Sequence, residues 1–461
     1  MNEPPVLAID LGTSAVKCAL VSADGRVLSG TRRLLHGANP AGWYRTALRA
    51  ARETLAATDR SRVQAIGLSG RGGATILCDA VGRALAPAAT GVPPPEYAPG
   101  APQRLRLPAW RVEQALAASP AIERRLRWLL AAKDYLLLRL GGVAATDPAS
   151  GPDALRWPAA GDASGGLLAE RLPAVHLPWQ CAGGLQPAAA AALGLPAGLP
   201  IATGLHDGVA AQVGAGVLQP GDAALTLGTH LVVRVVCPGD VARAVRFRFY
   251  RLWGETDERT VYGANARLAG AAAGWAARLI GAGECSLPAL ERTAAAVPAG
   301  SRGLLFLPYL GGMAYPQRRP ELGGALLGLR AEQGRGELFR AVLEGAACAV
   351  RHNAEALAAA GIDVGTPTLT GGGARSPLWR QILADTLARP LACSAAPEFA
   401  ECLGAARCAW VALGRYPSLD AAVAVGAAAT VVCEPTPAGM TAADALFDRF
   451  REAIASIAPV P

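Results

Sequence analysis

Short apolar runs and amphipathic segments alternate through the N-terminal part of the chain. Continuous apolar runs predict buried strands at residues 6–10 (VLAID), 15–22 (AVKCALVS) and 63–70 (VQAIGLSG). The turn signal ADGR at 23–26 leads into a further apolar stretch and predicts a hairpin. Apolar residues at helical spacing follow at 44–58. This region is therefore predicted to combine strands, tight turns and helices.

The middle of the chain has a less regular pattern. Residues 123–142 (ERRLRWLLAAKDYLLLRLGG) are predicted to form one long helix ended by glycines. A Pro- and Ala-rich stretch at 171–200 predicts a surface connection with one short helix. RFRFYR at 246–251 alternates like a strand with one charged face. A solvated face explains that alternation better than a binding strip does.

The second half repeats the alternation. Residues 221–236 (GDAALTLGTHLVVRVV) predict a hairpin with two apolar arms, and residues 335–361 predict the longest helix. TPTLTGGG at 366–373 predicts a strand that runs into glycines. A helix is then expected at 376–388, with Ser376 as its N-cap and proline at its first position. Mixed strands and helices in two similar halves predict an α/β protein.

Length and composition fit this picture. The chain has 461 residues, of which 52% are hydrophobic and 17% charged, so its size predicts two or three cored domains. The two similar halves favour two domains, at 1–217 and 218–461. Arg, Pro or Gly interrupts every long apolar stretch, which argues against a membrane span and a membrane partner. The N-terminus has no basic segment followed by an apolar one, so no secretion signal is visible and a cytoplasmic location is expected.

Cysteine and charge exclude several classes of function. The ten cysteines form no C-x-x-C pair and no cluster with histidine, which argues against a zinc site or a disulfide framework. The formal net charge is +8, but Lys17 and Lys133 are the only lysines and the arginines are spread along the chain. Compositional bias accounts for this charge, so no nucleic-acid partner is expected. The excess could equally attract anionic substrates.

One phrase occurs twice, as DLGTSAVK at 10–17 and as TLGTHLVV at 226–233. A tight hairpin containing Gly directs several backbone N–H groups toward phosphate oxygens, and Thr hydroxyls add donors. Either turn alone is explained by an ordinary hairpin with Gly at positive φ, but the pair favours function. Asp10 ends the first strand and could hold Mg²⁺ directly or through water. The Walker and G-x-G-x-x-G phosphate motifs are both missing.

Several longer stretches closely resemble the FGGY carbohydrate kinases, which belong to the superfamily of actin and hexokinase. The matching stretches are AIDLGTSAVKCALVSADGRVL, GLHDGVAAQVGAG, GDAALTLGTH and LTGGGARSPLWRQILADTLARP, and they follow the family's order from residue 6 to about residue 425. The resemblance implies two ribonuclease-H-like (actin-like ATPase) domains around a central nucleotide/sugar cleft. It also implies ATP-dependent phosphorylation of a hydroxyl on a small sugar or polyol, a ketopentose such as xylulose first, with Mg²⁺ as cofactor. Similar kinases are commonly homodimers.

The resemblance also implies residue roles. Asp207 would be the general base, although a helix N-cap is the alternative, and His206 would contact substrate or merely pack. Asp10 and Asp207 would hold Mg²⁺. Lys17 would neutralise phosphate charge, and the alternative is a solvent-facing strand lysine. The glycines at 372–373 would bind the nucleotide, and the alternative for them is a plain strand-to-helix turn. The residues expected to bind the nucleotide are Gly12, Thr13, Ser14, Lys17, Gly228, Thr229, Gly372, Gly373 and Ser376.

The sugar side departs from the family's pattern. Arg71, Gly72 and Gly73 replace a Gln-Met-His stretch, residues 89–97 replace a Trp-x-Asp-x-Arg segment, and residues 312–316 replace Gly-Glu-Arg-x-x-Pro. Arg71 and Gly72 are expected to bind the acceptor, with Arg71 donating to a hydroxyl or a carboxylate, or else serving a structural role.

Three alternatives to a function as a sugar kinase stay open. The first is a nucleotide-binding regulator that has lost sugar turnover, and the second is a kinase for another acceptor, such as a sugar acid. An actin- or chaperone-like machine is a distant third, since the sugar-kinase order of motifs is unexpected there.

Overall fold

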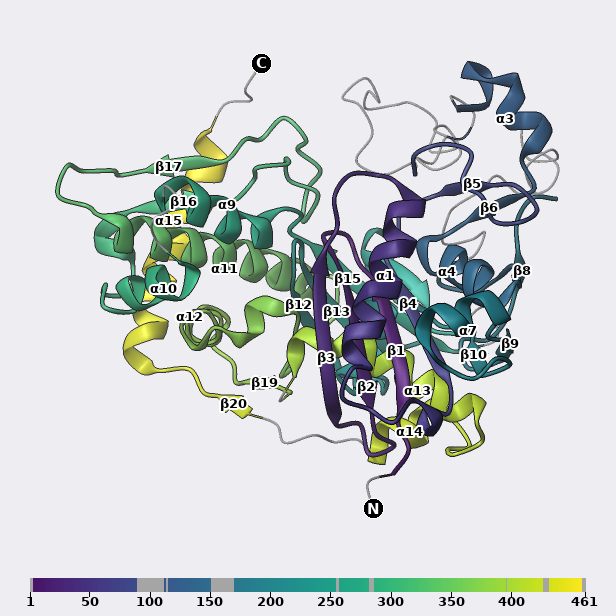
Figure 1. Cartoon of the computed structure of the whole chain (residues 1–461). Helices are drawn as coiled ribbons and strands as arrows, with labels where there is room; N and C mark the ends of the chain where they lie inside the picture. Colours follow the sequence, from purple (N-terminus) through teal and green to yellow (C-terminus); the bar gives the residue numbers. More distant parts are fainter. Residues whose placement is uncertain are drawn as a thin grey trace. The chain divides into compact units, whose positions relative to one another are not determined.

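The computed structural model describes residues 3–88, 112, 115–150, 170–253, 257–281, 286–394, 396–425 and 431–457. Contacts within the chain define two compact units (Figure 1). Unit 1 comprises Met1–Gly216, Tyr250–Asp257 and Phe399–Ala428, and unit 2 comprises Val217–Phe249, Glu258–Glu398 and Ala429–Pro461. The functional domains 1–217 and 218–461 stay a prediction.

The sheet of unit 1 carries its strands in the order β3-β2-β1-β4-β10-β9, with β11 also paired to β4. Strand β1 is antiparallel to β2 and parallel to β4, and β4 is parallel to β10. The predicted apolar runs form β1, β2 and β4. The bounds of the strands are β1 Val6–Leu11, β2 Ala15–Val21, β3 Val27–Leu34, β4 Ile66–Gly70, β9 Cys181–Gly184, β10 Pro200–Ala202 and β11 Leu205–His206.

The sheet of unit 2 contains strands in the order β15-β13-β12-β18-β19-β20. Strand β12 is antiparallel to β13 and parallel to β18, and β18 is parallel to β19. The bounds are β12 Ala223–Leu227, β13 Leu231–Pro238, β15 Arg259–Asn265, β18 Thr368–Thr370, β19 Leu391–Cys393 and β20 Val431–Cys433. The predicted hairpin at 221–236 is confirmed as β12 and β13.

The two sheets follow one plan. In each, a hairpin is extended on one side by a third antiparallel strand and on the other by two parallel strands. Strands β1, β2, β3, β4 and β10 correspond in this way to β12, β13, β15, β18 and β19. The predicted α/β class with two similar halves is confirmed.

Helices on both faces of the unit 1 sheet follow from the period-two pattern of its strands. Leu7, Ile9 and Leu11 of β1 pack in one apolar cluster with residues of α1 (Pro40–Thr54). The opposite face is covered by α13 (Ala400–Ala412), which contacts β1 and β4. The close approach depends on Gly67 of β4, where an added Cβ would lie 2.1 Å from the carbonyl oxygen of Ala405.

The remaining elements complete the two units. Unit 1 also contains β5 Ile76–Cys78, α3 Pro120–Arg125, β6 Trp128–Leu130, α4 Ala132–Gly141, β7 Ala145–Thr146, β8 Ala174–Val175, α7 Pro187–Leu193, α8 Asp207–Gly214 and α14 Leu419–Val425. Unit 2 also contains α9 Ala269–Gly281, α10 Leu287–Ala295, β16 Leu305–Leu307, β17 Ala325–Leu327, α11 Arg335–Ala359, α12 Pro377–Leu387 and α15 Pro437–Ser456. The predicted long helix at 335–361 is confirmed as α11.

Three predictions of local structure need correction. The single helix at 123–142 is wrong, because β6 (Trp128–Leu130) separates α3 from α4 and pairs with β5 in antiparallel fashion. Tertiary pairing outweighs helix propensity there. At 246–251 the strand β14 covers only Arg248–Arg251, and none of its residues is exposed. The stretch 171–200 contributes strands β8 and β9 as well as the short helix α7.

We expect Gly67→Ala to lower the free energy of unfolding by about 1–3 kcal/mol, because the methyl group would force α13 away from β4. Gly42→Ala in α1 is the matched control, since its Cβ would meet nothing closer than 3.5 Å and alanine favours the helix. Chemical denaturation followed by circular dichroism measures both. A Gly67→Ala protein as stable as the native one would contradict the packing described for α13.

Candidate active site

Three strands of unit 1 end at the same level. In the parallel register, Asp10 of β1 and Leu205 of β11 both lie opposite Ser69 of β4. The chain continues from β4 into Arg71, whose N–H donates to the carbonyl of Leu11 at 2.8 Å. Polar residues at the carboxyl ends of neighbouring parallel strands converge on one edge of a sheet, which is where α/β proteins bind ligands. Asp10, Arg71 and Asp207 therefore share this edge.

Asp10 is a buried carboxyl group whose charge is only partly compensated by neighbouring groups. Its side chain is only 1% exposed and accepts a hydrogen bond from Ser69 Oγ at 3.0 Å. Lys17 lies directly opposite it in the β1–β2 ladder, with Nζ 3.6 Å from Asp10 Oδ2. Burial raises the pKa of Asp10 to about 7, against the opposing effect of the Lys17 charge. The charge of Lys17 thus compensates only part of the penalty for burying the Asp10 carboxylate.

Lys17 is not the solvent-facing lysine that was the alternative at this position. Its Nζ lies 2.6 Å from Glu401 Oε2 of α13, and its side chain is 16% exposed. Burial works against the charge of Lys17, but Glu401 and Asp10 together raise its pKa above the usual value. Sequence reasoning missed Glu401, because a partner 384 positions away leaves no local signal.

The first repeated turn joins β1 to β2. Gly12 N–H donates to the carbonyl of Ala15 at 3.1 Å, and Thr13 and Ser14 are exposed at the tip. Neither Gly12 nor its counterpart Gly228 has a positive φ, so the alternative of glycines in the left-handed region is wrong. The glycine is needed for closeness instead, since an added Cβ on Gly12 would lie 3.0 Å from the Ala15 oxygen.

Asp207 begins α8 but does not cap it. The N-cap is His206, whose Nδ1 accepts a hydrogen bond from Gly208 N–H at 3.0 Å. Asp207 Oδ1 accepts from the same N–H at 2.7 Å, and the Asp207 side chain is 30% exposed. The negative charge of Asp207 is felt at both Asp10 and Arg71. The N-cap predicted as the alternative role of Asp207 is therefore supplied by His206.

Residues 71–73, which depart from the family's pattern, follow β4 and place Arg71 and Gly72 at the same edge. The Arg71 guanidinium lies 5.6 Å from the centre of the Trp43 ring, and its Nε is buried without a hydrogen-bond partner among the described residues. Burial lowers the pKa of Arg71, opposed by the charge of Asp207. The position of the His206 ring requires glycine at residue 72, because an added Cβ there would lie 1.9 Å from His206 Nε2. Residues 89–97 lie outside the described residues.

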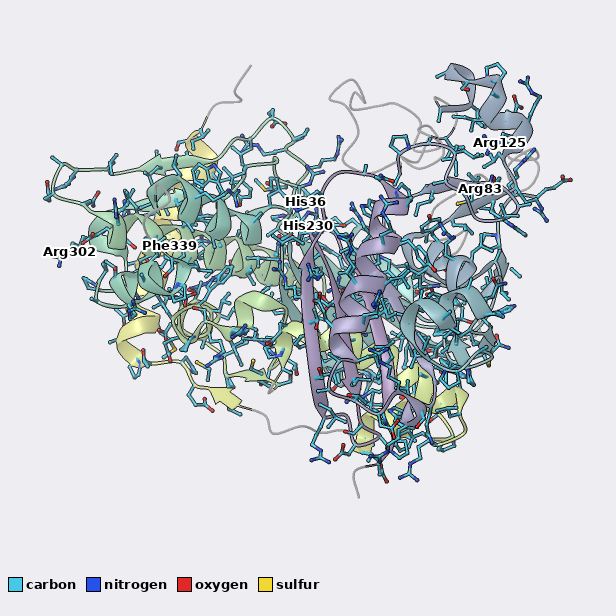
Figure 2. The ribbon with its side chains drawn as sticks, in the orientation of Figure 1. His36, Arg83, Arg125, His230, Arg302 and Phe339 are labelled. Atoms are coloured by element: carbon cyan, nitrogen blue, oxygen red, sulfur yellow. The ribbon has the colours of Figure 1, made fainter. Side chains whose placement is uncertain are left out.

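The second repeated turn joins β12 to β13 in unit 2. Gly228 N–H donates to the carbonyl of His230 at 3.2 Å; Figure 2 labels His230 at this turn. The helix α9 packs tightly against it, since Ala271 N–H donates to the Thr229 carbonyl at 2.8 Å. An added Cβ on Gly270 would lie 1.9 Å from the Gly228 oxygen. The N-terminus of α9 therefore packs against this turn.

The glycine loop after β18 lies beside this second turn. Gly371 has φ of 87°, and an added Cβ there would lie 2.6 Å from the carbonyl oxygen of Leu227. Gly372 has open space where its Cβ would be. The predicted N-cap is confirmed, because Ser376 Oγ accepts a hydrogen bond from Trp379 N–H at 3.2 Å. Unit 2 therefore brings together Gly228, Thr229, Gly372, Gly373 and Ser376.

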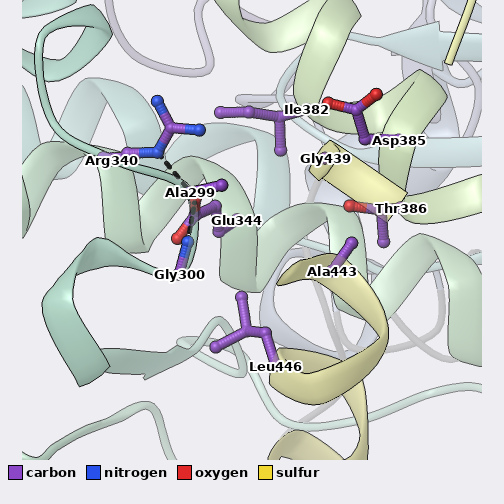
Figure 3. A pocket seen from close by; sticks show the side chains of 10 residues that line it. All are labelled: Ala299, Gly300, Arg340, Glu344, Ile382, Asp385, Thr386, Gly439, Ala443 and Leu446. Atoms are coloured by element: carbon purple, nitrogen blue, oxygen red, sulfur yellow. Dashed lines mark hydrogen bonds and ion pairs between the residues drawn. The ribbon is translucent and has the colours of Figure 1, made fainter. Parts of the chain in front are cut away.

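A small cavity in unit 2 is too narrow for a nucleotide or a sugar. Its volume is about 20 Å³, which is room for roughly one water molecule. Figure 3 shows Arg340 and Glu344 on its wall, joined by an ion pair with Nε 2.7 Å from Oε1. Glu344 also accepts hydrogen bonds from Gly300 N–H and Ser301 Oγ. The polar groups here are satisfied by one another and serve the packing of α11.

Comparison with known proteins places the chain in a family. Residues 224–413 match the model of the C-terminal domain of the FGGY family of carbohydrate kinases. The xylulose kinase of Klebsiella pneumoniae is 31% identical over 88% of this chain and 90% of its own length. The chain belongs to the FGGY family of carbohydrate kinases. It is therefore a sugar kinase that uses ATP, and a small-molecule sugar is its substrate.

Other FGGY kinases agree along the whole length. The xylulose kinase of Escherichia coli is 29% identical over 90% of this chain and 91% of its own. The crystal structure of xylulose kinase from Rhodospirillum rubrum has a TM-score of 0.75 at 26% identity and covers 98% of both chains. The predicted fold class of two actin-like ATPase domains is thereby confirmed. In the part of the chain that the structure describes, no helix is long and apolar enough to cross a membrane.

We expect the buried carboxyl of Asp10 to make this FGGY kinase less stable as the pH rises from about 4 to about 7. The folded state holds the proton of Asp10 up to about pH 7, whereas the unfolded chain releases it near 3.8, so folding loses this advantage across that window. Without divalent cations, the native protein should lose at most about 4 kcal/mol relative to Asp10→Asn there. Urea unfolding at several pH values measures the difference, and a pH-independent difference would contradict the raised pKa.

Proposed function

We propose that this FGGY kinase transfers the γ-phosphoryl group of ATP to a hydroxyl of a ketopentose such as xylulose. The observation that carries the proposal is the likeness to xylulose kinases over about nine-tenths of the chain, at 29–31% identity. The arrangement at the carboxyl ends of β1, β4 and β11 supports it, because it supplies carboxylates and an arginine at one edge of unit 1.

Asp207 is the general base in this proposal. Its carboxylate takes the proton of the acceptor hydroxyl as that oxygen bonds to the γ-phosphorus, and the bond to the β–γ bridging oxygen breaks to release ADP. The position at the first residue of α8 fits this role, since Asp207 is anchored through Gly208 N–H yet 30% exposed. His206, held by its own cap hydrogen bond, would contact the acceptor together with Gly72.

The residues proposed to bind the nucleotide are described for each unit by itself. In unit 1, Gly12, Thr13, Ser14 and Lys17 would contact phosphate oxygens from the first turn. In unit 2, the residues proposed for the phosphates and the adenosine are Gly228, Thr229, Gly372, Gly373 and Ser376. The free space at Gly372 supports the assignment, because a base or ribose can approach the backbone there.

Mg²⁺ is the proposed metal, with Asp10 and Asp207 as its protein ligands, directly or through water. Among the described residues there is no group of three or more His, Cys, Asp or Glu side chains that could hold a metal ion. Mg²⁺ is usually held by one or two carboxylates together with substrate phosphates and waters. When bound, it would neutralise charge on the phosphates. The homodimer and the cytoplasmic location stay predictions.

We expect Asp207→Asn to lower acceptor-dependent ADP release about 10²- to 10⁴-fold, because the amide accepts no proton. The affinity for ATP without Mg²⁺ should be kept, because Asp207 is proposed to contact the metal and the acceptor rather than the nucleotide. ADP release from Mg-ATP with xylulose, and ATP titration by calorimetry, measure the two quantities. Asp59→Asn, which changes another aspartate at a helix start in unit 1, is the matched control. If the native chain binds ATP but no sugar, polyol or sugar acid stimulates turnover, the nucleotide-binding regulator becomes the better account.

A sugar acid is the second candidate acceptor, and the buried Nε of Arg71 without a partner favours it. If Arg71 binds a carboxylate, Arg71→Gln should lower kcat/KM for gluconate about 10- to 100-fold and change kcat/KM for xylulose much less. Arg33→Gln, at an exposed ion pair with Glu53, is the control. Steady-state kinetics on both acceptors decide between them, and failure of native enzyme to phosphorylate any sugar acid removes this candidate.

A further inference from the structure

The ion pair between Lys17 and Glu401 joins a strand beside the first turn to a distant helix. Lys17 Nζ lies 2.6 Å from Glu401 Oε2 but 3.6 Å from Asp10 Oδ2, so Glu401 is the nearer of its two partners. All three side chains are at most 16% exposed. A lysine has a flexible four-carbon stem, and a close acidic partner restricts the positions that its ammonium can take.

Helix α13 holds Glu401 in a fixed position. An added Cβ on Gly404 of α13 would lie 2.0 Å from the carbonyl oxygen of Ala210, and one on Gly214 would lie 1.8 Å from that of Ala400. These contacts bring the backbones of α13 and α8 together, and α8 begins with Asp207. The same helix also packs on β4 through Gly67. Glu401 therefore lies on a helix that packs closely against both the sheet and α8.

Loss of Glu401 would leave Lys17 with Asp10 as its remaining acidic neighbour. The ammonium would then be drawn toward the carboxylate proposed to hold Mg²⁺. Glu401 offsets this attraction, because its carboxylate is the nearer of the two to Lys17 Nζ.

We propose that Glu401 is a positioning residue that holds the Lys17 ammonium where ATP phosphates bind, and that it acts on the reaction only through Lys17. The inference rests on the proposed function, which assigns Lys17 to the nucleotide. Glu401 itself touches neither ATP nor the acceptor. Its effect is confined to binding and orientation of the nucleotide, and the acceptor is bound by other residues.

A double-mutant cycle tests this. Glu401→Ala should raise KM for ATP and the ATP dissociation constant about 10- to 100-fold, with little change in KM for xylulose, since misplacing a phosphate-binding group by about 1 Å can cost up to 10²-fold. Lys17→Met should have an effect at least as large. The double variant should be no worse than Lys17→Met alone, because Glu401 has nothing left to position. Glu401→Gln, which still accepts a hydrogen bond, should recover part of the affinity.

Two controls separate this proposal from a structural role and from failure of the proposed function. Glu53→Gln removes the carboxylate of another ion pair in unit 1 and should leave KM for ATP unchanged. Additive effects in the cycle, or a Glu401→Ala protein with native ATP affinity, would overturn the positioning role. ATP titration does not depend on turnover, so it tests Glu401 even if no acceptor is phosphorylated. Should Glu401→Ala fail to fold, the same cycle is run with Glu401→Gln.

Discussion

The parallel register of β1, β4 and β11 is the constraint on which the proposed chemistry depends. Because Asp10 and Leu205 share the level of Ser69, the residues that follow these strands emerge together. A slip of β1 by one residue would turn Asp10 toward the apolar face that packs on α1 and replace it with a leucine or isoleucine. The hydrophobic alternation that builds the core is thus also what aims the carboxyl group at α13.

Unit 2 uses the same register for a different purpose. Thr226 of β12 lies opposite Thr370 of β18, and each strand then runs into glycines. Where unit 1 places charged side chains at its strand ends, unit 2 places backbone that a ligand can approach closely. One strand order therefore supports two kinds of surface, and the difference lies in a few residues after each strand. The repeated phrase in the sequence marks the equivalent hairpins of the two units, and the residues after the strands are where the two units differ.

Much of this was predictable from local patterns. Apolar runs located the paired strands, and the Ser-Pro signal located the start of α12, because a cap is decided by residues within one helical turn. The strand β6 was not predictable, since Trp128 and its neighbours suit a helix until β5 is available for pairing. The N-cap of α8 at His206 instead of Asp207 was not predictable, because a difference of one residue at a helix start is not resolved by sequence patterns. The role of Glu401 as the partner of Lys17 could be found only from the structure, because the two residues lie 384 positions apart.

The helix α13 has a consequence for how the chain acquires its structure during synthesis. Residues up to Gly216 form most of unit 1, yet α13, at residues 400–412, packs on the face of β1 and β4 that carries Asp10. At roughly 5–20 residues per second, that face waits many seconds on the ribosome for its cover. During this interval Lys17 lacks its partner Glu401, and the face of β1 and β4 that α13 later covers is exposed. A fragment ending at residue 216 would be left permanently in that unfinished condition, although its sequence includes the proposed base.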